Sequence, residues 1–214
     1  MVELYTFFRS STSFRLRIAL GYKGLDYEPR YVSLPKMEHH AADYLAKNPQ
    51  GLVPALVDDA GKVFTQSMAM IEYLDDVHPE PPLMPKGAED KWYVRAVSQI
   101  IGCEMHPLNN VRVLKYLRGY GLDDAKVNGD WYPHWVAEGF KSLESFLVEQ
   151  KRTGRFCLGS QFTMADICLI PQVFNAQRFD CDLKPYPTVM KVFEAGAALD
   201  AVKKAEPSTQ ADKF

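Results

Sequence analysis

The feature that most constrains the fold of this chain is a proline-rich stretch, PEPPLMPKG, at residues 79–87. Four of its nine residues are prolines. Proline lacks the backbone N–H that a helix or a central strand needs, so no regular element continues through this stretch. We therefore predict two domains, at residues 1–80 and 89–214, joined by a linker at residues 81–88.

The residues before the linker alternate between strand and helix patterns. Strands are predicted at 2–7, 27–34, 52–58 and 62–66, and helices at about 12–23, 39–48 and 67–78. This order is a βαβ unit followed by a hairpin and a helix. It is typical of a small mixed sheet with helices packed on it, so we predict an α/β domain.

The residues after the linker show almost only the helical pattern. Long helices are predicted at 90–105, 131–150, 163–179 and 186–199. In the third of them, Thr163 and Asp166 have the spacing of a capping box, which we interpret as structural. The last residues, 205–214, read as a loose tail. The second domain is therefore predicted to be all-α.

Composition excludes several classes of function. The chain has 214 residues, with 25 basic and 27 acidic side chains, and nucleic-acid binding would require a basic excess. No apolar run approaches the ~20 residues of a membrane span, and the chain begins in a strand without a signal-peptide pattern. The four cysteines form no CxxC pair and the five histidines no HExxH motif, so we expect reduced thiols, no metal site and a cytoplasmic protein.

Four consecutive hydroxyl side chains, Ser10 to Ser13, lie where the first strand turns into the first helix. The simplest interpretation is a helix cap, because serine and threonine oxygens accept hydrogen bonds from the first helical N–H groups. One residue is enough to cap a helix, however. The surplus hydroxyls favour an anion site at this helix N-terminus.

Two further junctions have a structural and a functional interpretation. Pro54 stands before an apolar strand, as an edge-strand proline or, far more rarely, after a cis bond that would leave the N–H and C=O of Val53 free for an extended peptide. Ser67, after Gln66, is the expected N-cap of the next helix. Its hydroxyl and N–H are also suited to binding a carboxylate.

Together these motifs resemble the glutathione transferases, and the resemblance covers the chain end to end. SSTSFRLRIAL, NPQGLVPAL, QSMAMIEYL, FTMADICLIPQVFNAQRF and LKPYPTV are similar to the zeta class, which includes maleylacetoacetate isomerases. HPLNNVRVLKYLR at 106–118, and Thr12, are closer to the bacterial maleylpyruvate isomerases of that class. Many zeta enzymes have cysteine in place of Thr12.

The resemblance implies a thioredoxin-like glutathione-binding domain, an all-helical substrate-binding domain, glutathione as cofactor and a homodimer. It implies that Ser10, with Ser11 and Thr12, donates hydrogen bonds to the glutathione sulfur, whereas Ser13 serves the helix. Val53 and Pro54 would contact the cysteinyl backbone, and Gln66 and Ser67 the γ-glutamyl carboxylate. The remaining predicted glutathione contacts are His39, His106 and Asn110.

Three arginines point to the substrate. By the same resemblance Arg9, Arg112 and Arg178 bind the carboxylates of a maleyl-keto acid, with Arg9 and Arg178 also stabilising charge during the reaction. The alternative for each is a surface charge. Arg15 and Arg17, in the first helix, are expected to pair with structural carboxylates or carbonyls.

The predicted activity is the glutathione-dependent cis–trans isomerisation of maleylacetoacetate or maleylpyruvate to the fumaryl product. The first alternative is a transferase that conjugates or dehalogenates small electrophiles such as α-haloacids. It would share every glutathione contact, so only the three arginines argue against it. The second alternative is a non-enzymatic interaction protein of the same fold.

Overall fold

The computed structural model describes residues 2–214 and divides the chain into two compact units. One unit comprises Met1–Leu83, described from residue 2, together with Ala198–Phe214, and the other comprises Met84–Ala197. These units differ from the predicted division in two respects. Residues 198–214 group with the first unit, and the boundary between Leu83 and Met84 falls inside the predicted linker at 81–88. The functional division into a glutathione-binding and a substrate-binding domain stays a prediction.

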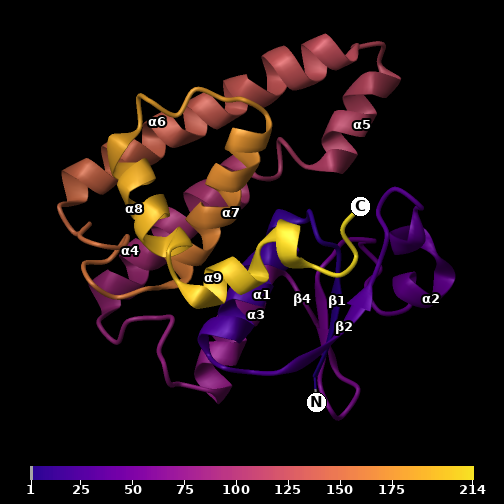
Figure 1. Cartoon of the computed structure of the whole chain (residues 1–214), viewed down its shortest axis with the longest axis horizontal. Helices are drawn as coiled ribbons and strands as arrows, with labels where there is room; N and C mark the ends of the chain where they lie inside the picture. Colours follow the sequence, from indigo (N-terminus) through magenta and orange to yellow (C-terminus); the bar gives the residue numbers. More distant parts are fainter. Residues whose placement is uncertain (1) are drawn as a thin grey trace. The chain divides into compact units, whose positions relative to one another are not determined.

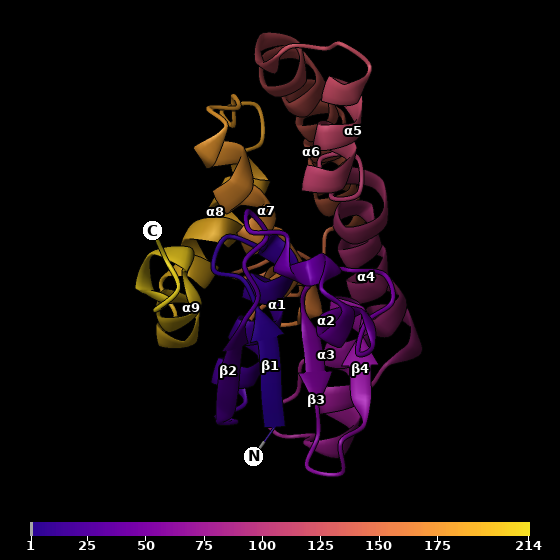
Figure 2. The ribbon, with the colours of Figure 1, turned by 90° about the vertical axis from the view of Figure 1, so that its right-hand side faces the viewer.

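The first unit contains a four-stranded mixed sheet. Its strands are β1 (Val2–Thr6), β2 (Tyr27–Tyr31), β3 (Ala55–Val57) and β4 (Val63–Thr65), in the order β2-β1-β3-β4 (Figure 2). β1 runs parallel to β2, whereas β3 is antiparallel to both β1 and β4. Pro29 lies in the edge strand β2, where its missing N–H leaves no gap in the interior of the sheet.

Helices cover both faces of this sheet. α1 (Ser11–Tyr22) and α3 (Ser67–Val77) pack together on one face, with α9 (Asp200–Ala205) beside α1, and α2 (Ala42–Leu45) lies on the other side (Figure 1). α1 is buried along most of its length. The helix predicted at 39–48 is interrupted, because Ala41 is extended and separates the short 3-10 turn η1 (Glu38–His40) from α2.

The C-terminal residues are held against the first unit, so the prediction of a loose tail was wrong. The Phe8 N–H donates to Asp212 Oδ2 at 2.9 Å. The Phe214 ring lies edge-on to the Phe8 ring, with centroids 5.1 Å apart. The chain reaches this position through α9 and the 3-10 turn η4 (Pro207–Thr209). The segment is mostly polar, and its sequence therefore gave no indication that it packs against the first unit.

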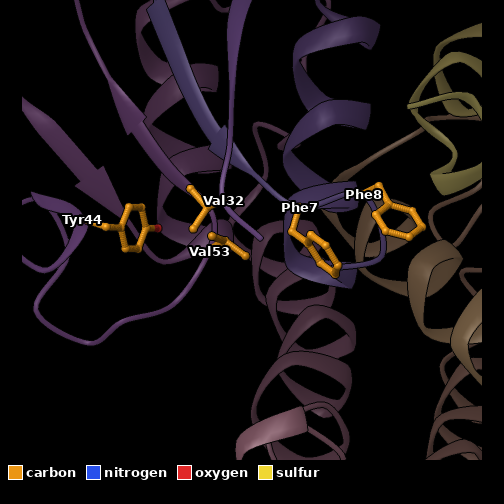
Figure 3. Close-up of a cluster of buried hydrophobic side chains, with 5 residues drawn as sticks. All are labelled: Phe7, Phe8, Val32, Tyr44 and Val53. Atoms are coloured by element: carbon orange, nitrogen blue, oxygen red, sulfur yellow. The ribbon is translucent and has the colours of Figure 1, made fainter. Parts of the chain in front are cut away.

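A small apolar cluster supports the loops at one end of the sheet. It consists of Phe7, Phe8, Val32, Tyr44 and Val53, all at least nine-tenths buried (Figure 3). Phe7 and Phe8 come from the connection between β1 and α1, and Val53 from the loop that leads into β3. The cluster therefore fixes the backbone of two of the three predicted binding segments.

The second unit consists of helices, as predicted. They are α4 (Ala88–Gln99) with the π-helical turn η2 (Ile100–Met105), α5 (Val111–Gly119), the π-helical turn η3 (Ala125–Trp131), α6 (Tyr132–Gln150), α7 (Met164–Arg178) and α8 (Pro187–Ala197). The sequence predicted α4, α6, α7 and α8 but not α5 or η3. α5 was missed because Leu114 is its one buried residue. None of the helices in residues 2–214 is long and apolar enough to cross a membrane.

α7 is the most deeply buried helix of this unit and starts at the predicted capping box. Asp166 Oδ2 accepts hydrogen bonds from the N–H and the hydroxyl of Thr163, at 2.8 and 3.0 Å. Its Oδ1 accepts from the Cys157 N–H at 2.7 Å, so the carboxylate also ties the preceding loop to the helix. Burial raises the pKa of Asp166 to about 6, and these hydrogen bonds oppose the rise.

Candidate active site

Ser10 is the N-cap of α1 and the first member of a chain of hydroxyl groups. Its Oγ accepts a hydrogen bond from the Ser13 N–H at 3.2 Å and lies 2.9 Å from Thr12 Oγ1. Thr12 Oγ1 in turn donates to the Val53 carbonyl at 2.9 Å. The structure thus brings together three of the predicted binding residues.

Counting hydroxyl protons shows which group is the donor in each hydrogen bond between Ser10, Thr12 and Val53. Each hydroxyl has one proton to donate, and the Thr12 proton is used on the Val53 carbonyl. Ser10 must therefore donate its own proton to Thr12 while its oxygen accepts from the Ser13 N–H. A ligand can take the place of Thr12 as the acceptor of the Ser10 hydroxyl proton, and the bond from the Ser13 N–H that caps the helix then stays intact.

Ser13 does not cap α1, which corrects the assignment of the helix-capping role. Its side chain is fully buried, and its Oγ accepts from the Phe7 N–H at 3.5 Å. It therefore braces the connection between β1 and α1 from inside. Ser11, the first residue of α1, is also buried. Because a serine oxygen accepts while its proton is donated, Ser10 can cap the helix and bind an anion at once.

The loop before β3 presents a backbone donor. The Val53–Pro54 bond is cis, which the sequence left as the rarer alternative. The preceding carbonyl, of Leu52, is held by the Tyr44 hydroxyl at 2.6 Å and by Asn48 Nδ2 at 2.7 Å. Among residues 2–214 the Val53 N–H has no hydrogen-bond acceptor. A fixed backbone with an unused N–H is suited to pairing with an extended peptide.

The start of α3 differs by one residue from the prediction. The N-cap is Gln66, whose φ is positive at 70°, and Ser67 is the first helical residue. Non-glycine residues with positive φ are uncommon and cluster at ligand sites. Gln66 Nε2 donates to Gln50 Oε1 at 2.8 Å, so its side chain does not cap the helix. Ser67 is buried, and its Oγ lies 3.5 Å from Arg15 Nη1.

Arg9 and His39 lie beside two different predicted binding segments of the first unit. The exposed Arg9 guanidinium carbon lies 5.0 Å from the centroids of both the Phe8 and Phe214 rings, within cation–π range. The His39 carbonyl would be 3.1 Å from a Cβ atom at Gly51, whose φ is +60°. The positive φ and this close carbonyl both favour glycine at position 51. The short distance also shows that His39 lies against the loop that carries Val53.

The other predicted site residues belong to the second unit. Asn110 is the N-cap of α5, and its Oδ1 accepts from the Arg112 N–H at 3.1 Å. Arg178 is the last residue of α7, exposed, with its guanidinium 4.8 Å from the Phe179 ring. Burial raises the pKa of Tyr132, and the charge of Arg178 opposes that rise. His106 directly follows η2, where burial is partial.

Two of the chain's own thiols, those of Cys157 and Cys181, are poorly suited to nucleophilic chemistry. None of the four cysteines forms a disulfide. Burial, together with the Asp166 carboxylate, raises the pKa of Cys157 well above its usual value. Burial also raises the pKa of Cys181 to about 11. Residues 2–214 hold no group of three or more His, Cys, Asp or Glu side chains that could share a metal ion, and the expectation that no metal is used stays a prediction.

Arg15 and Arg17 turn out to differ. Arg17 hydrogen-bonds the carbonyls of Ala205, Phe7 and Phe8, as expected of a structural arginine. Arg15 forms no ion pair with any carboxylate of residues 2–214 and approaches only Ser67. The expectation that Arg15 pairs with a structural carboxylate or carbonyl was therefore wrong, whereas the same expectation for Arg17 is confirmed.

Comparisons with known proteins agree with the expected family. A model of "Glutathione S-transferase, N-terminal domain" matches residues 4–82, and one of "Glutathione S-transferase, C-terminal domain" matches residues 129–195. A maleylpyruvate isomerase of a Ralstonia species is 45% identical over 212 residues, which is 99% of both chains.

Solved structures give the same result. The holo structure of a maleylpyruvate isomerase, described as a bacterial glutathione S-transferase in the zeta class, superposes with a TM-score of 0.95 at 45% identity and covers 99% of this chain and 100% of its own. A maleylacetoacetate isomerase from Methylobacterium extorquens AM1, with bound malonate and GSH, has a TM-score of 0.95 at 38% identity over 99% of each chain. Because this likeness extends over nearly the whole length of each protein, the chain belongs to the glutathione S-transferase family, in its zeta class.

Proposed function

We propose that this protein is a glutathione-dependent cis–trans isomerase of a maleyl-keto acid, converting maleylacetoacetate or maleylpyruvate to the fumaryl product. The observation that carries the proposal is the similarity, at 45% identity from end to end, to a maleylpyruvate isomerase. The hydroxyl chain at the start of α1 is the local feature that agrees with it.

The residues of the first unit fit glutathione chemically. Its peptide-like backbone matches the unused N–H of Val53, and its γ-glutamyl carboxylate matches the uncapped N-terminus of α3. We assign these contacts to Val53 and Pro54, and to Gln66 and Ser67, with His39 beside them. His106 and Asn110 are proposed to contribute contacts from the helical unit.

Bound glutathione supplies the sulfur nucleophile whose temporary attachment allows rotation about the substrate double bond. The contribution of this chain is to keep that sulfur anionic. The Ser10 hydroxyl donates a hydrogen bond to the sulfur, and the N-terminus of α1, where Ser11 and Thr12 lie, adds partial positive charge. Cys157 and Cys181, whose pKa values are raised by burial, do not compete for this role.

The arginines are proposed to bind the two carboxylates of the substrate. Guanidinium groups bind carboxylates through two parallel hydrogen bonds, which also fixes their orientation. Arg9 is supported by its position beside Ser10 and by the rings that hold it, and Arg178 by its exposure at the end of α7. Arg112, exposed on α5, is the third. Arg9 and Arg178 also stabilise negative charge that develops on the substrate oxygens.

The test is an assay of both maleyl-keto acids with and without glutathione, while free thiol is measured. We expect isomerisation to require glutathione and to leave its concentration unchanged. Stoichiometric loss of free thiol would instead indicate a conjugating transferase. Failure to bind a glutathione-affinity resin would favour a non-enzymatic protein of this fold.

Two broader features complete the proposal. We propose that the protein acts as a homodimer, as its family resemblance implies, and that it works in the cytoplasm, where reduced thiols persist. The lack of a disulfide among the four cysteines supports the second point. Gel filtration with light scattering would test the first.

A further inference from the structure

Arg15 is an arginine without a counter-charge inside the first unit. Its side chain is 1% exposed. Nη1 lies 3.5 Å from Ser67 Oγ, at the limit of a hydrogen bond, and Nε and Nη2 have no hydrogen-bond partner. No carboxylate of residues 2–214 forms an ion pair with it.

Arg17 shows that burial in α1 does not by itself leave an arginine without hydrogen-bond partners. It lies two residues further along the same helix and is equally buried, at 2% exposed. Its guanidinium nevertheless donates to three carbonyls and to the Thr6 hydroxyl. A buried cation with unused donors is strongly unfavourable, and it is retained where another group supplies the missing negative charge.

The position of Arg15 indicates where that group binds. Ser67 is the first residue of α3, and no side chain caps this helix. Among residues 2–214 the N–H groups of Ser67, Met68 and Ala69 have no acceptor. The helix N-terminus and the guanidinium thus both bring positive charge close to the Ser67 hydroxyl.

The hydroxyl of Ser67 links the two. Arginine only donates hydrogen bonds, so the Ser67 oxygen must be the acceptor of the contact with Arg15. The Ser67 proton therefore remains for a ligand. An anion that binds at the start of α3 can accept hydrogen bonds from the Ser67 hydroxyl and from the helical N–H groups. It is also attracted by the charge of Arg15, which is buried and therefore not screened by water.

We propose that Arg15 is the buried counter-charge of the γ-glutamyl carboxylate of glutathione and acts through Ser67 as a positioning residue. The inference rests on the proposed function, since glutathione is the ligand. It goes beyond the predicted contacts, which place only Gln66 and Ser67 at this carboxylate. It also gives the buried charge of Arg15 a partner of opposite sign, which residues 2–214 do not provide.

The test compares two ligands by titration calorimetry. One is glutathione and the other is 4-aminobutyryl-cysteinylglycine, which keeps the amino group but lacks the γ-glutamyl carboxylate. In Arg15→Met, which removes the charge and preserves apolar volume, we expect the affinity for glutathione to fall about 10- to 100-fold, the usual range for a hydrogen bond to a charged group. The affinity for the analogue should change less than threefold.

Thermal unfolding provides a readout that a structural role would not produce. Without ligand, Arg15→Met should melt at or above the temperature of the natural protein, because an uncompensated charge has been removed. The rise in melting temperature on adding glutathione should be smaller. Arg17→Met is the matched control: it should melt lower and weaken both ligands alike. Arg15→Gln, uncharged but polar, should behave as Arg15→Met and serves if the latter does not fold.

Three results would overturn the inference. They are equal weakening of both ligands in the Arg15 variants, no weakening of either, or a lower melting temperature of both variants without ligand. If the natural protein binds the analogue as well as it binds glutathione, no carboxylate site exists. If the natural protein binds neither, the proposed function fails together with the inference. Binding of glutathione with unchanged selectivity in the variants refutes the role of Arg15 alone.

Discussion

Replacement of Asp166 by alanine tests how the helical unit is held together. The carboxylate accepts three buried hydrogen bonds, from the Cys157 N–H and from the N–H and hydroxyl of Thr163. Alanine leaves these donors without a partner, at about 1–3 kcal/mol each. At about 2 kcal/mol for each donor, the free energy of unfolding falls by about 6 kcal/mol before any gain is considered.

The gain comes from no longer burying a charge. Burial raises the pKa of Asp166 from its ordinary value of 3.8 to about 6, so the folded state binds its proton more tightly than the unfolded state. Stability from such a group is complete below pH 3.8 and is lost as the pH rises towards 6, which amounts to about 3 kcal/mol at neutral pH. The net loss for Asp166→Ala at pH 7 is therefore about 3 kcal/mol.

Urea denaturation at pH 5 and at pH 7.5 separates the loss of the hydrogen bonds from the cost of the buried charge. The loss caused by Asp166→Ala should be larger at pH 5 by about 1–1.5 kcal/mol, because the cost of the charge is only partly present there. Glu144→Ala is a suitable control, since Glu144 also accepts two backbone hydrogen bonds, from Thr188 and Val189, but is only partly buried. It should lose about 1–2 kcal/mol. A loss below 1 kcal/mol for Asp166→Ala, or one that grows with pH, would refute this reasoning.

Other predictions concern the two units separately. Ser10→Ala should lower turnover by a factor of about 10²–10³ and stability by about 1 kcal/mol, whereas Ser13→Ala should affect mainly stability; equal effects on turnover would leave Ser10 as a cap alone. Arg178→Ala should raise KM for maleyl-keto acids by about 10- to 100-fold with unchanged glutathione binding, and Arg178→Lys should restore part of this. Normal kinetics in folded Arg178→Ala would make it a surface charge. Deletion of residues 212–214 should lower the free energy of unfolding by about 1 kcal/mol in denaturant titrations, through loss of the bond to the Phe8 N–H; an unchanged midpoint would show that the tail contributes nothing.

Much of the fold is encoded locally and was therefore predictable. The apolar periods define the strands and the long helices, and Thr163 with Asp166 marks the start of α7 through contacts within one helical turn. What the sequence did not predict depends on partners distant along the chain. The tail is polar, yet Asp212 bonds the backbone of Phe8. α5 has one buried residue, Leu114, and so lacks the apolar stripe that identifies a helix.

In the candidate site, too, some features could be predicted from local sequence and others could not. The sequence placed Ser10, Val53 and Ser67 at three junctions, and the structure joins Ser10 to Val53 through Thr12. It did not place the caps correctly. Ser10 rather than Ser13 caps α1, and Gln66 rather than Ser67 precedes α3, because a cap is decided by backbone angles such as the φ of 70° at Gln66. A run of hydroxyl residues contains several candidates for a cap and no local signal that selects one.

Arg15 and Arg17 show why periodicity alone does not assign a role. They have the same chemistry, lie in the same helix and are buried to the same extent. Arg17 faces carbonyl oxygens that the chain itself provides, from residues as distant as Ala205, so its donors are satisfied by folding. Arg15 faces a serine at the uncapped start of α3, where the chain provides one weak acceptor. Of these two buried arginines, folding leaves donors unused on Arg15 but not on Arg17, and this difference depends on what lies opposite each side chain.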